Sequence, residues 1–262
     1  DPVENSALMP WLALTAFVHS IMVQKRRGMF RMWNIILITI AFSLAQMGMF
    51  INRGGPVPSV HSFAESTMGW IFLFFMGLTL LGSLAAFVWR VDTLKSRERL
   101  ESMLSRESAF LVQNALFLVV AFVTLWGTIY PVISQAIQGE IITVGEPFFN
   151  RINGPVLLTI VFLMGIGPLL PWRRATVRTV LSVLKYPIGV AIAVALALVV
   201  TGIREPLVIV ALSVIAMAVS GIAHEWMRGT RSRHHKDERY HVAFCKLLIG
   251  NRPRYGGYIV HL

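Results

Sequence analysis

Apolar stretches long enough to cross a lipid bilayer recur along the whole chain, and they restrict the fold more than any other feature. About 20 helical residues, rising 1.5 Å each, span a hydrocarbon core of about 30 Å. The stretches lie at residues 7–24, 32–51, 68–89, 109–133, about 154–172, 188–203 and 207–226, and a further one begins at residue 255. We therefore predict an all-α integral membrane protein, a polytopic transmembrane helix bundle with about eight segments.

Hydrophobic residues make up 55% of the chain and charged residues only 14%, so the apolar share exceeds that of an ordinary soluble domain. No polar region separates the apolar stretches into parts, and we expect one membrane domain over residues 1–262. The chain opens at Asp1 rather than at Met, has no signal-peptide pattern, and stops at Leu262 a few residues into an apolar run. We expect a fragment of a longer chain.

Basic residues gather in alternate connections between the apolar stretches. The basic connections contain residues 25–31, 90–106, 173–185 and 228–254, whereas the remaining ones hold only Arg53, Arg151 and Arg204. This alternation is the positive-inside pattern, which predicts that the basic connections face the cytoplasm and the others face outward. A net charge of +11 would suggest nucleic acid for a soluble protein, but its distribution favours membrane topology and no nucleic-acid partner.

Two connections allow more specific expectations. Residues 91–108 mix charges of both signs with leucines, which fits either a short helix at the membrane surface or a solvated linker. Residues 134–153 are polar and are expected to form an outward loop. The single cysteine, Cys245, lies in the largest basic connection, so an internal disulfide is impossible.

Two histidines lie within apolar stretches, where an imidazole is costly unless it faces protein, water or a metal. His19 comes six residues before Lys25 and His261 seven residues after Arg254, so both should lie roughly 9–10 Å inside the same membrane edge. Histidines at matched depth on two helices can coordinate a haem iron from opposite faces. Alternatively, each hydrogen-bonds a neighbouring helix.

His61 differs because it lies in an outward connection rich in glycine and proline. A fixed loop can present an imidazole to haem arriving from outside, although an ordinary exposed histidine is an equal alternative. His224 is expected at the membrane interface. No cysteine or carboxylate pattern completes a metal site around the remaining histidines, which we interpret as solvated: His234, His235 and His241.

The outward connections also carry charged and aromatic residues. Arg53 and Arg151 could pair with the two propionates of a haem, because a guanidinium matches carboxylate geometry, or they could anchor the protein at the interface. Trp11 and Asp1 belong to the same outward group and are candidates for a haem pocket. No nucleophile motif or phosphate loop is present, and no catalytic residue can be named.

Several segments together resemble the CcmF family of cytochrome c-type biogenesis proteins, which handle haem through a tryptophan-rich WWD signature. DPVEN at residues 1–5 and MPWL at 9–12 are similar to the end of that signature, so the fragment would start within it and end within a transmembrane helix. The other matching segments are SVHSFA at 59–64, SRES at 105–108, GTIYP at 127–131, FNRINGP at 149–155, MGIGPLLPWR at 164–173 and RYGGYIVH at 254–261.

The resemblance implies a haem lyase, a cytochrome c synthetase working within a complex. It would accept haem from the chaperone CcmE and attach it to the Cys-x-x-Cys-His motif of apocytochrome c, which the partner CcmH handles. His19 and His261 would hold a resident haem b in the membrane, and His61 would be one of two outward ligands for the delivered haem. The location implied is the bacterial inner membrane, with the haem chemistry on its periplasmic face.

Departures from the family pattern limit this transfer. The loop at residues 52–58 differs from that of many members, and the opening tryptophans and the second outward histidine are absent from this chain. Two other functions compete with the lyase, namely a haem exporter or transporter and a non-catalytic membrane scaffold of the assembly complex. The spans contain no Asp or Glu well inside, which argues against proton or cation coupling.

Overall fold

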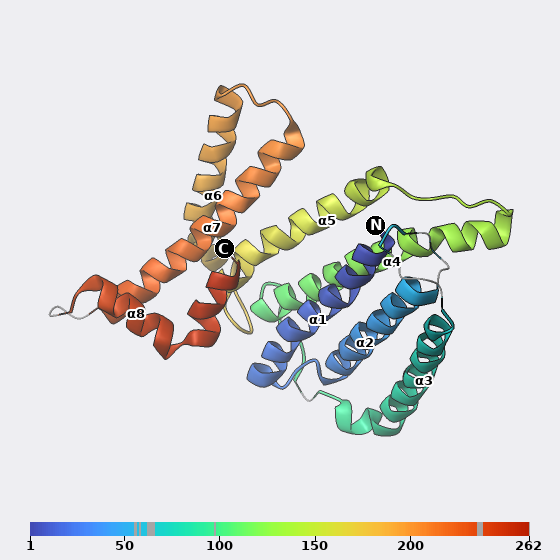
Figure 1. Ribbon diagram of the computed structural model, residues 1–262. Coiled ribbons are helices and arrows are strands. Elements are labelled where there is room, and N and C mark those ends of the chain that lie inside the picture. Colours follow the sequence, from blue (N-terminus) through green and yellow to red (C-terminus); the bar gives the residue numbers. More distant parts are fainter. Residues whose placement is uncertain (55–56, 58, 62–65, 97, 235–237, 262) are drawn as a thin grey trace. The chain divides into compact units, whose positions relative to one another are not determined.

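The computed structural model describes residues 1–54, 57, 59–61, 66–96, 98–234 and 238–261, and these residues form helices and connections without any strand. The α-helices are α1 (Pro2–Arg27), α2 (Arg31–Gly54), α3 (Met68–Leu94), α4 (Arg106–Gln138), α5 (Glu146–Ile166), α6 (Val177–Val200), α7 (Pro206–Arg233) and α8 (Tyr240–Gly250) (Figure 1). Among the described residues, α1 to α7 are long and apolar enough to cross a membrane. The predicted all-α, multi-pass membrane fold is confirmed.

The last predicted segment is short in the structure. Residues Arg252–Gly256 form a π-helix, η2, and Gly257–His261 form a 3₁₀-helix, η3. The 3₁₀-helix η1 (Gly167–Leu169) follows α5. Helix α8 lies within the stretch 228–254 that the charge pattern marks as a connection.

Some helix ends differ from those expected. Helix α4 continues to Gln138 and α5 begins at Glu146, so most of the stretch predicted as an outward loop is helical. Glu146 and Pro147 suit a first helical turn, where an acidic side chain meets the positive end of the helix dipole and proline lacks only an unused N–H. Helix α6 begins soon after Thr176, whose side chain accepts a hydrogen bond from Thr179 N at 3.2 Å.

The connection at residues 91–108 contains no separate helix among its described residues. Helix α3 continues to Leu94, and α4 begins only at Arg106. The described residues between the two helices therefore fit a linker, but Ser105, Glu107 and Ser108 at the end of the stretch are buried and not solvated.

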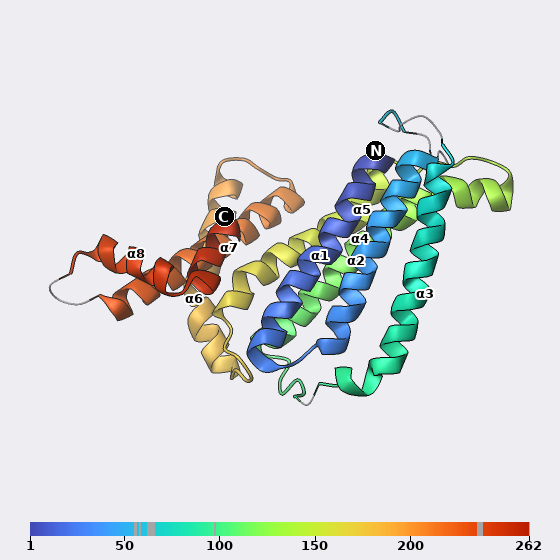
Figure 2. The same ribbon diagram turned by 60° about the horizontal axis from the view of Figure 1, so that its bottom comes forward.

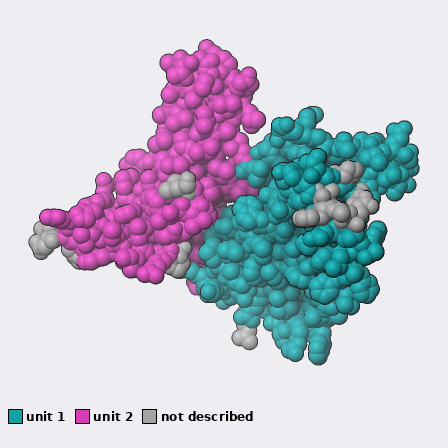
Figure 3. All heavy atoms as spheres, in the orientation of Figure 1, with its two compact units in different colours: residues 1–100, 110–157 teal, residues 101–109, 158–262 magenta. Residues whose placement is uncertain are grey.

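The chain divides into two compact units (Figure 3). Unit 1 comprises residues 1–100 and 110–157, and unit 2 comprises residues 101–109 and 158–262. Each unit has its own internal packing and is described by itself, and the single membrane domain stays a prediction.

In unit 1, α2 lies between α1 and α3 (Figure 2). The side of α1 that faces its neighbours carries small and apolar residues that are fully buried, including Met9, Leu12, Ala13 and Ala16. Helix α3 has only Gly69 buried, and its many exposed apolar side chains suit contact with lipid.

Polar contacts join α1 to α4. With its amide oriented to pair donors with acceptors, the buried Asn114 donates to the carbonyl oxygens of Ala16 (3.0 Å) and Phe110 (3.2 Å).

In unit 2, α6 and α7 pack as a helical hairpin joined by residues 201–205. Two glycines allow the end of α5 to lie directly against α7. A Cβ added at Gly165 would lie 2.8 Å from Ala218 Cα, and one added at Gly221 would lie 3.2 Å from the carbonyl oxygen of Gly165. Small residues at such positions let helix backbones approach closely, which is how membrane helices gain packing energy.

Candidate functional site

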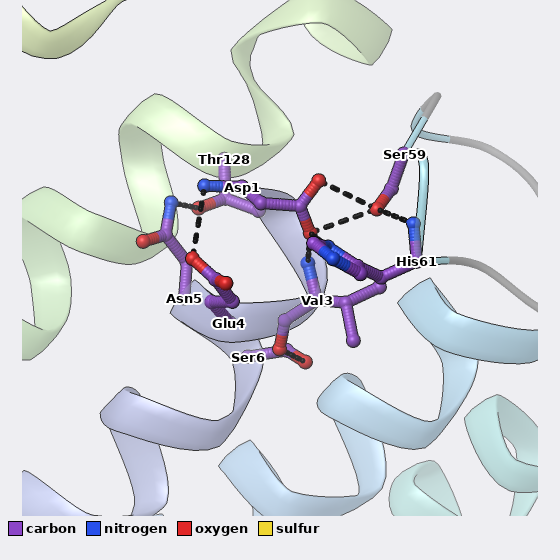
Figure 4. A network of polar contacts seen from close by, with 8 residues as sticks. All are labelled: Asp1, Val3, Glu4, Asn5, Ser6, Ser59, His61 and Thr128. Carbon is purple, nitrogen blue, oxygen red and sulfur yellow. Dashed lines mark hydrogen bonds and ion pairs between the residues drawn. The ribbon is translucent and has the colours of Figure 1, made fainter.

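His61 is tied to the beginning of α1 through Ser59 and Asp1 (Figure 4). The His61 N–H donates to Ser59 Oγ at 3.1 Å, and Ser59 Oγ in turn lies 2.8 and 2.7 Å from the two carboxylate oxygens of Asp1. The His61 Nδ1 atom lies 3.5 Å from Asp1 Oδ1. That oxygen also caps α1 by accepting a hydrogen bond from Val3 N at 2.8 Å. The loop therefore holds His61 at a fixed place relative to α1.

The His61 side chain is 56% exposed, whereas the Asp1 side chain is only 16% exposed. The carboxylate thus lies behind the imidazole, on the protein side. A ring held in this way by one nitrogen can offer its other nitrogen, Nε2, to a ligand or metal.

A cavity of about 420 Å³ lies beside Asp1 within unit 1. Its walls come from the start of α1, from α4 and α5, from the connection before α5 and from Val57 in the connection between α2 and α3: Asp1, Pro2, Asn5, Val57, Gly127, Thr128, Pro131, Thr143, Val144, Gly145, Glu146 and Phe149. Three of the segments that resemble the CcmF family, DPVEN, GTIYP and FNRINGP, therefore meet around one cavity. Sequence reasoning did not find this cavity.

Close packing and hydrogen bonds fix these walls. A Cβ added at Gly127 would lie 2.6 Å from Phe149 Cζ, so only glycine leaves room for that ring. Asn5 Nδ2 donates to Thr128 Oγ1 at 3.1 Å, which joins α1 to α4. One turn earlier on α4, the buried Thr124 Oγ1 accepts a hydrogen bond from Asn153 Nδ2 of α5 at 3.4 Å. The three helices are thus connected by polar side chains within an apolar unit.

His19 lies on α1 and is half-buried against α4. Its Nδ1 lies 2.8 Å from the carbonyl oxygen of Thr15, one helical turn earlier, so the N–H at Nδ1 donates and the lone pair of a neutral ring is on Nε2. Ring centroids of Phe110 and Phe117 lie 5.8 and 6.3 Å from the imidazole. An imidazole oriented by a backbone carbonyl within aromatic surroundings has the features of a haem ligand.

His261 ends η3 in unit 2, and the residues before it are anchored to α7. Arg254 Nη2 lies 2.7 Å from Oε2 of Glu225, a residue with only 1% of its side chain exposed. Trp226 Nε1 donates to the carbonyl oxygen of Tyr255 at 3.2 Å. A Cβ added at Gly229 would lie 2.9 Å from the Tyr255 hydroxyl, so the segment lies against the helix. Sequence reasoning had named His261 but not the residues that position it.

A second anchored connection in unit 2 links two segments that resemble the family. Arg106 Nε donates to the carbonyl oxygen of Leu170 at 3.0 Å, and another of its guanidinium nitrogens donates to the carbonyl oxygen of Pro168. The buried Glu107 accepts from Arg173 N with both carboxylate oxygens at 3.0 Å. The SRES segment therefore holds the backbone of the PLLPWR segment in place, and the contact between them is a structural one.

The structure brings together only some of the predicted site residues. Asp1 and His61 are in contact within unit 1. Arg53 lies in the last turn of α2, where its carbonyl oxygen accepts from Ser66 N at 3.1 Å. Arg151 is exposed on α5, and Trp11 is 58% exposed on α1. His19 belongs to unit 1 and His261 to unit 2, so their pairing stays a prediction.

The other histidines have simple surroundings. The His224 ring lies 5.2 Å from that of Tyr186, and the His234 ring 5.6 Å from that of Tyr240. His241 is exposed at the start of α8. His235 and residues 62–64 of the SVHSFA segment are outside the described residues.

Comparisons with known proteins identify the family. No family model matches the chain. A cytochrome c-type biogenesis protein CcmF from Haemophilus influenzae is 39% identical over 175 residues, which are 66% of this chain and 27% of that protein. The Escherichia coli CcmF is 38% identical over 185 residues, or 70% and 28% of the two chains. This chain belongs to the CcmF family.

A solved CcmF structure has the same fold. That structure, described as the cytochrome c heme lyase CcmF, matches all of this chain and 37% of its own, with a TM-score of 0.71 and 29% sequence identity. The cytochrome c-type biogenesis protein CycK of Rhizobium meliloti is a further CcmF relative, 38% identical over 66% of this chain and 26% of that protein. The chain spans about a quarter of the length of the curated CcmF relatives it matches.

Proposed function

We propose that this chain is the haem-binding part of a cytochrome c synthetase, a haem lyase that attaches haem to apocytochrome c. The observation that carries the proposal is the His61–Ser59–Asp1 arrangement beside a cavity, in a chain of the CcmF family. His61 Nε2 would bind the iron of haem arriving from CcmE. The thiols of the Cys-x-x-Cys-His motif, handled by CcmH, would then add to its vinyl groups.

A resident haem b in the membrane fits the surroundings of His19. Its Nδ1 is satisfied by Thr15 and its ring is lined by Phe110 and Phe117, so a neutral imidazole is held in an apolar setting. We propose that His19 and His261 would hold this group, and that the anchoring of residues 254–258 to α7 positions His261. When bound, such a haem would supply electrons to the delivered one.

The remaining candidates would act around the delivered haem. Arg53 lies in the last turn of α2, the helix before the connection that carries His61, and Arg151 is exposed on α5, so each could pair with a propionate. Trp11 is exposed on α1 and could contact the porphyrin edge. The charge alternation supports an outward, periplasmic position for His61 in a bacterial inner membrane.

The test uses the full-length protein purified in detergent, with pyridine haemochrome and reduced-minus-oxidised spectra. We expect a low-spin b-type signal that His19→Ala and His261→Ala remove and His61→Ala retains. His224→Ala is the matched control, because His224 packs against Tyr186 in a membrane helix and should leave the signal unchanged. Normal haem in both membrane-histidine variants would contradict the resident site.

A second assay separates the lyase from its competitors. Cells that produce the full-length His61→Ala protein should form little covalent cytochrome c while keeping resident haem. Haem bound or moved without any thioether product would favour an exporter, and a folded but haem-free protein would favour a scaffold.

A further inference from the structure

The contact between Asp1 and His61 gives the carboxylate a role separate from the ligands themselves. We propose that Asp1 is a positioning residue that holds the His61 imidazole with Nδ1–H toward the carboxylate and Nε2 toward the delivered haem. This inference rests on the proposed function of His61 as a haem ligand.

Asp1 contacts the side chain of His61 directly and is linked to its backbone through Ser59, and both contacts support this role. The Asp1 carboxylate lies 3.5 Å from His61 Nδ1, and Ser59 Oγ lies within 2.8 Å of both carboxylate oxygens while accepting the His61 N–H. The side chain and the backbone of His61 are thus both held relative to one carboxylate. Asp1 is itself fixed, because it caps α1 at Val3 N and its side chain is only 16% exposed.

The charge of Asp1 excludes its most direct alternative role. Its alternative role as a haem-pocket residue would be contact with a propionate, but two carboxylates at short range repel each other. A carboxylate facing a histidine Nδ1–H instead favours the tautomer with its lone pair on Nε2 and makes that nitrogen a stronger donor to a metal. The negative charge therefore suits the imidazole side of the site and not the haem edge.

A carboxylate behind a ligating histidine has measurable consequences for the metal. Removing such an outer partner typically lowers metal affinity about 10- to 100-fold. A stronger imidazole donor favours ferric over ferrous iron, so losing it should raise the reduction potential. A tenfold change in the ferric-to-ferrous affinity ratio corresponds to about 59 mV for one electron.

The decisive variant is Asp1→Asn in the full-length protein. Asparagine caps a helix about as well as aspartate, so α1 keeps its first turn while the charge is lost. Ferric protoporphyrin IX is titrated into the purified protein, and the affinity and midpoint potential of the added haem are measured. We expect about 10-fold weaker ferric binding and a potential higher by about 59 mV, with the resident haem spectrum unchanged.

Two further variants make the result specific. Glu4 is in the same helical turn as Asp1, and its side chain is 71% exposed. Glu4→Gln removes its carboxylate and should leave the ferric haem affinity and the midpoint potential unchanged. Ser59→Ala removes the hydroxyl that joins Asp1 to the His61 backbone, and it should weaken ferric binding less than Asp1→Asn does. The second variant tests the same arrangement without touching the α1 cap.

The His61→Ala protein separates failure of this inference from failure of the proposed function. If His61→Ala abolishes the titrated site but Asp1→Asn binds ferric haem with wild-type affinity and potential, the positioning role is refuted while the ligand assignment stands. If His61→Ala binds the added haem as tightly as the wild type, His61 is not the ligand and both proposals fail.

Discussion

Glu225 is the residue whose change should detach the segment that carries His261, the proposed partner of His19, without touching a proposed haem ligand. Its carboxylate is 1% exposed and lies 2.7 Å from Arg254 Nη2, whose side chain is 35% exposed. Glu225→Gln keeps the size of the side chain and removes the charge. Arg254 then loses its buried anionic partner, and residues 254–261 lose their strongest polar contact with α7.

The free energy that Glu225→Gln should remove from the attachment of residues 254–261 to α7 lies between two limits. Exposed ion pairs contribute about 0–1 kcal/mol, and breaking a fully buried pair costs about 3–5 kcal/mol. Glu225 is buried but Arg254 is one-third exposed. We therefore expect the attachment of the segment to weaken by about 2 kcal/mol, a value between the two limits. At 1.4 kcal/mol per factor of ten, this shifts the balance between attached and detached segment about 30-fold.

The assay is resident haem content per folded full-length protein, together with thermal stability in the same detergent. We expect Glu225→Gln to lose most of the resident haem while the protein stays folded. The matched control is Glu238→Gln, which removes a carboxylate from an ion pair with the exposed Lys246 in the same unit. If Glu225→Gln retains haem as fully as Glu238→Gln does, the ion pair does not position His261.

Two glycine substitutions test the close contacts within each unit. Gly127→Ala would push a methyl group to 2.6 Å from Phe149 Cζ, and we expect the ring to move into the cavity and lower the yield of covalent cytochrome c, whereas Gly154→Ala, with open space at its Cβ, should not. Gly165→Ala meets backbone 2.8 Å away on α7 and should destabilise the protein by about 1–3 kcal/mol. Thermal unfolding checks this against Gly189→Ala, which has open space; equal melting temperatures would contradict the packing argument.

The membrane spans could be predicted from sequence because the property that defines them is local. Lipid requires about 20 consecutive apolar residues, and such a run is visible without knowing any contact. The helix ends were less predictable. Ser134 looks like a loop residue, yet its hydroxyl donates to the carbonyl oxygen of Pro131 within α4, so a polar side chain is satisfied without ending the helix.

The arrangement around the site could not be predicted, because it depends on contacts between distant residues. Ser59 and Asp1 are 58 positions apart, and Arg254 and Glu225 are 29 apart. Each residue type fits a solvated surface equally well when only its neighbours in sequence are considered. The family resemblance includes Asp1 and the histidines, but it predicted neither the contact between Asp1 and His61 nor the role of Glu225.

The two histidines of unit 1 are held in ways that suit different tasks. His19 is part of a continuous helix, is oriented by a backbone carbonyl and is lined by two phenylalanine rings, so releasing a group bound there would require α1 and α4 to separate. His61 is 56% exposed on a loop and is oriented by one carboxylate and one hydroxyl. Local opening of a loop costs far less than separating packed helices. These surroundings agree with the proposed roles, in which His19 holds a resident cofactor and His61 binds a haem that leaves attached to its product.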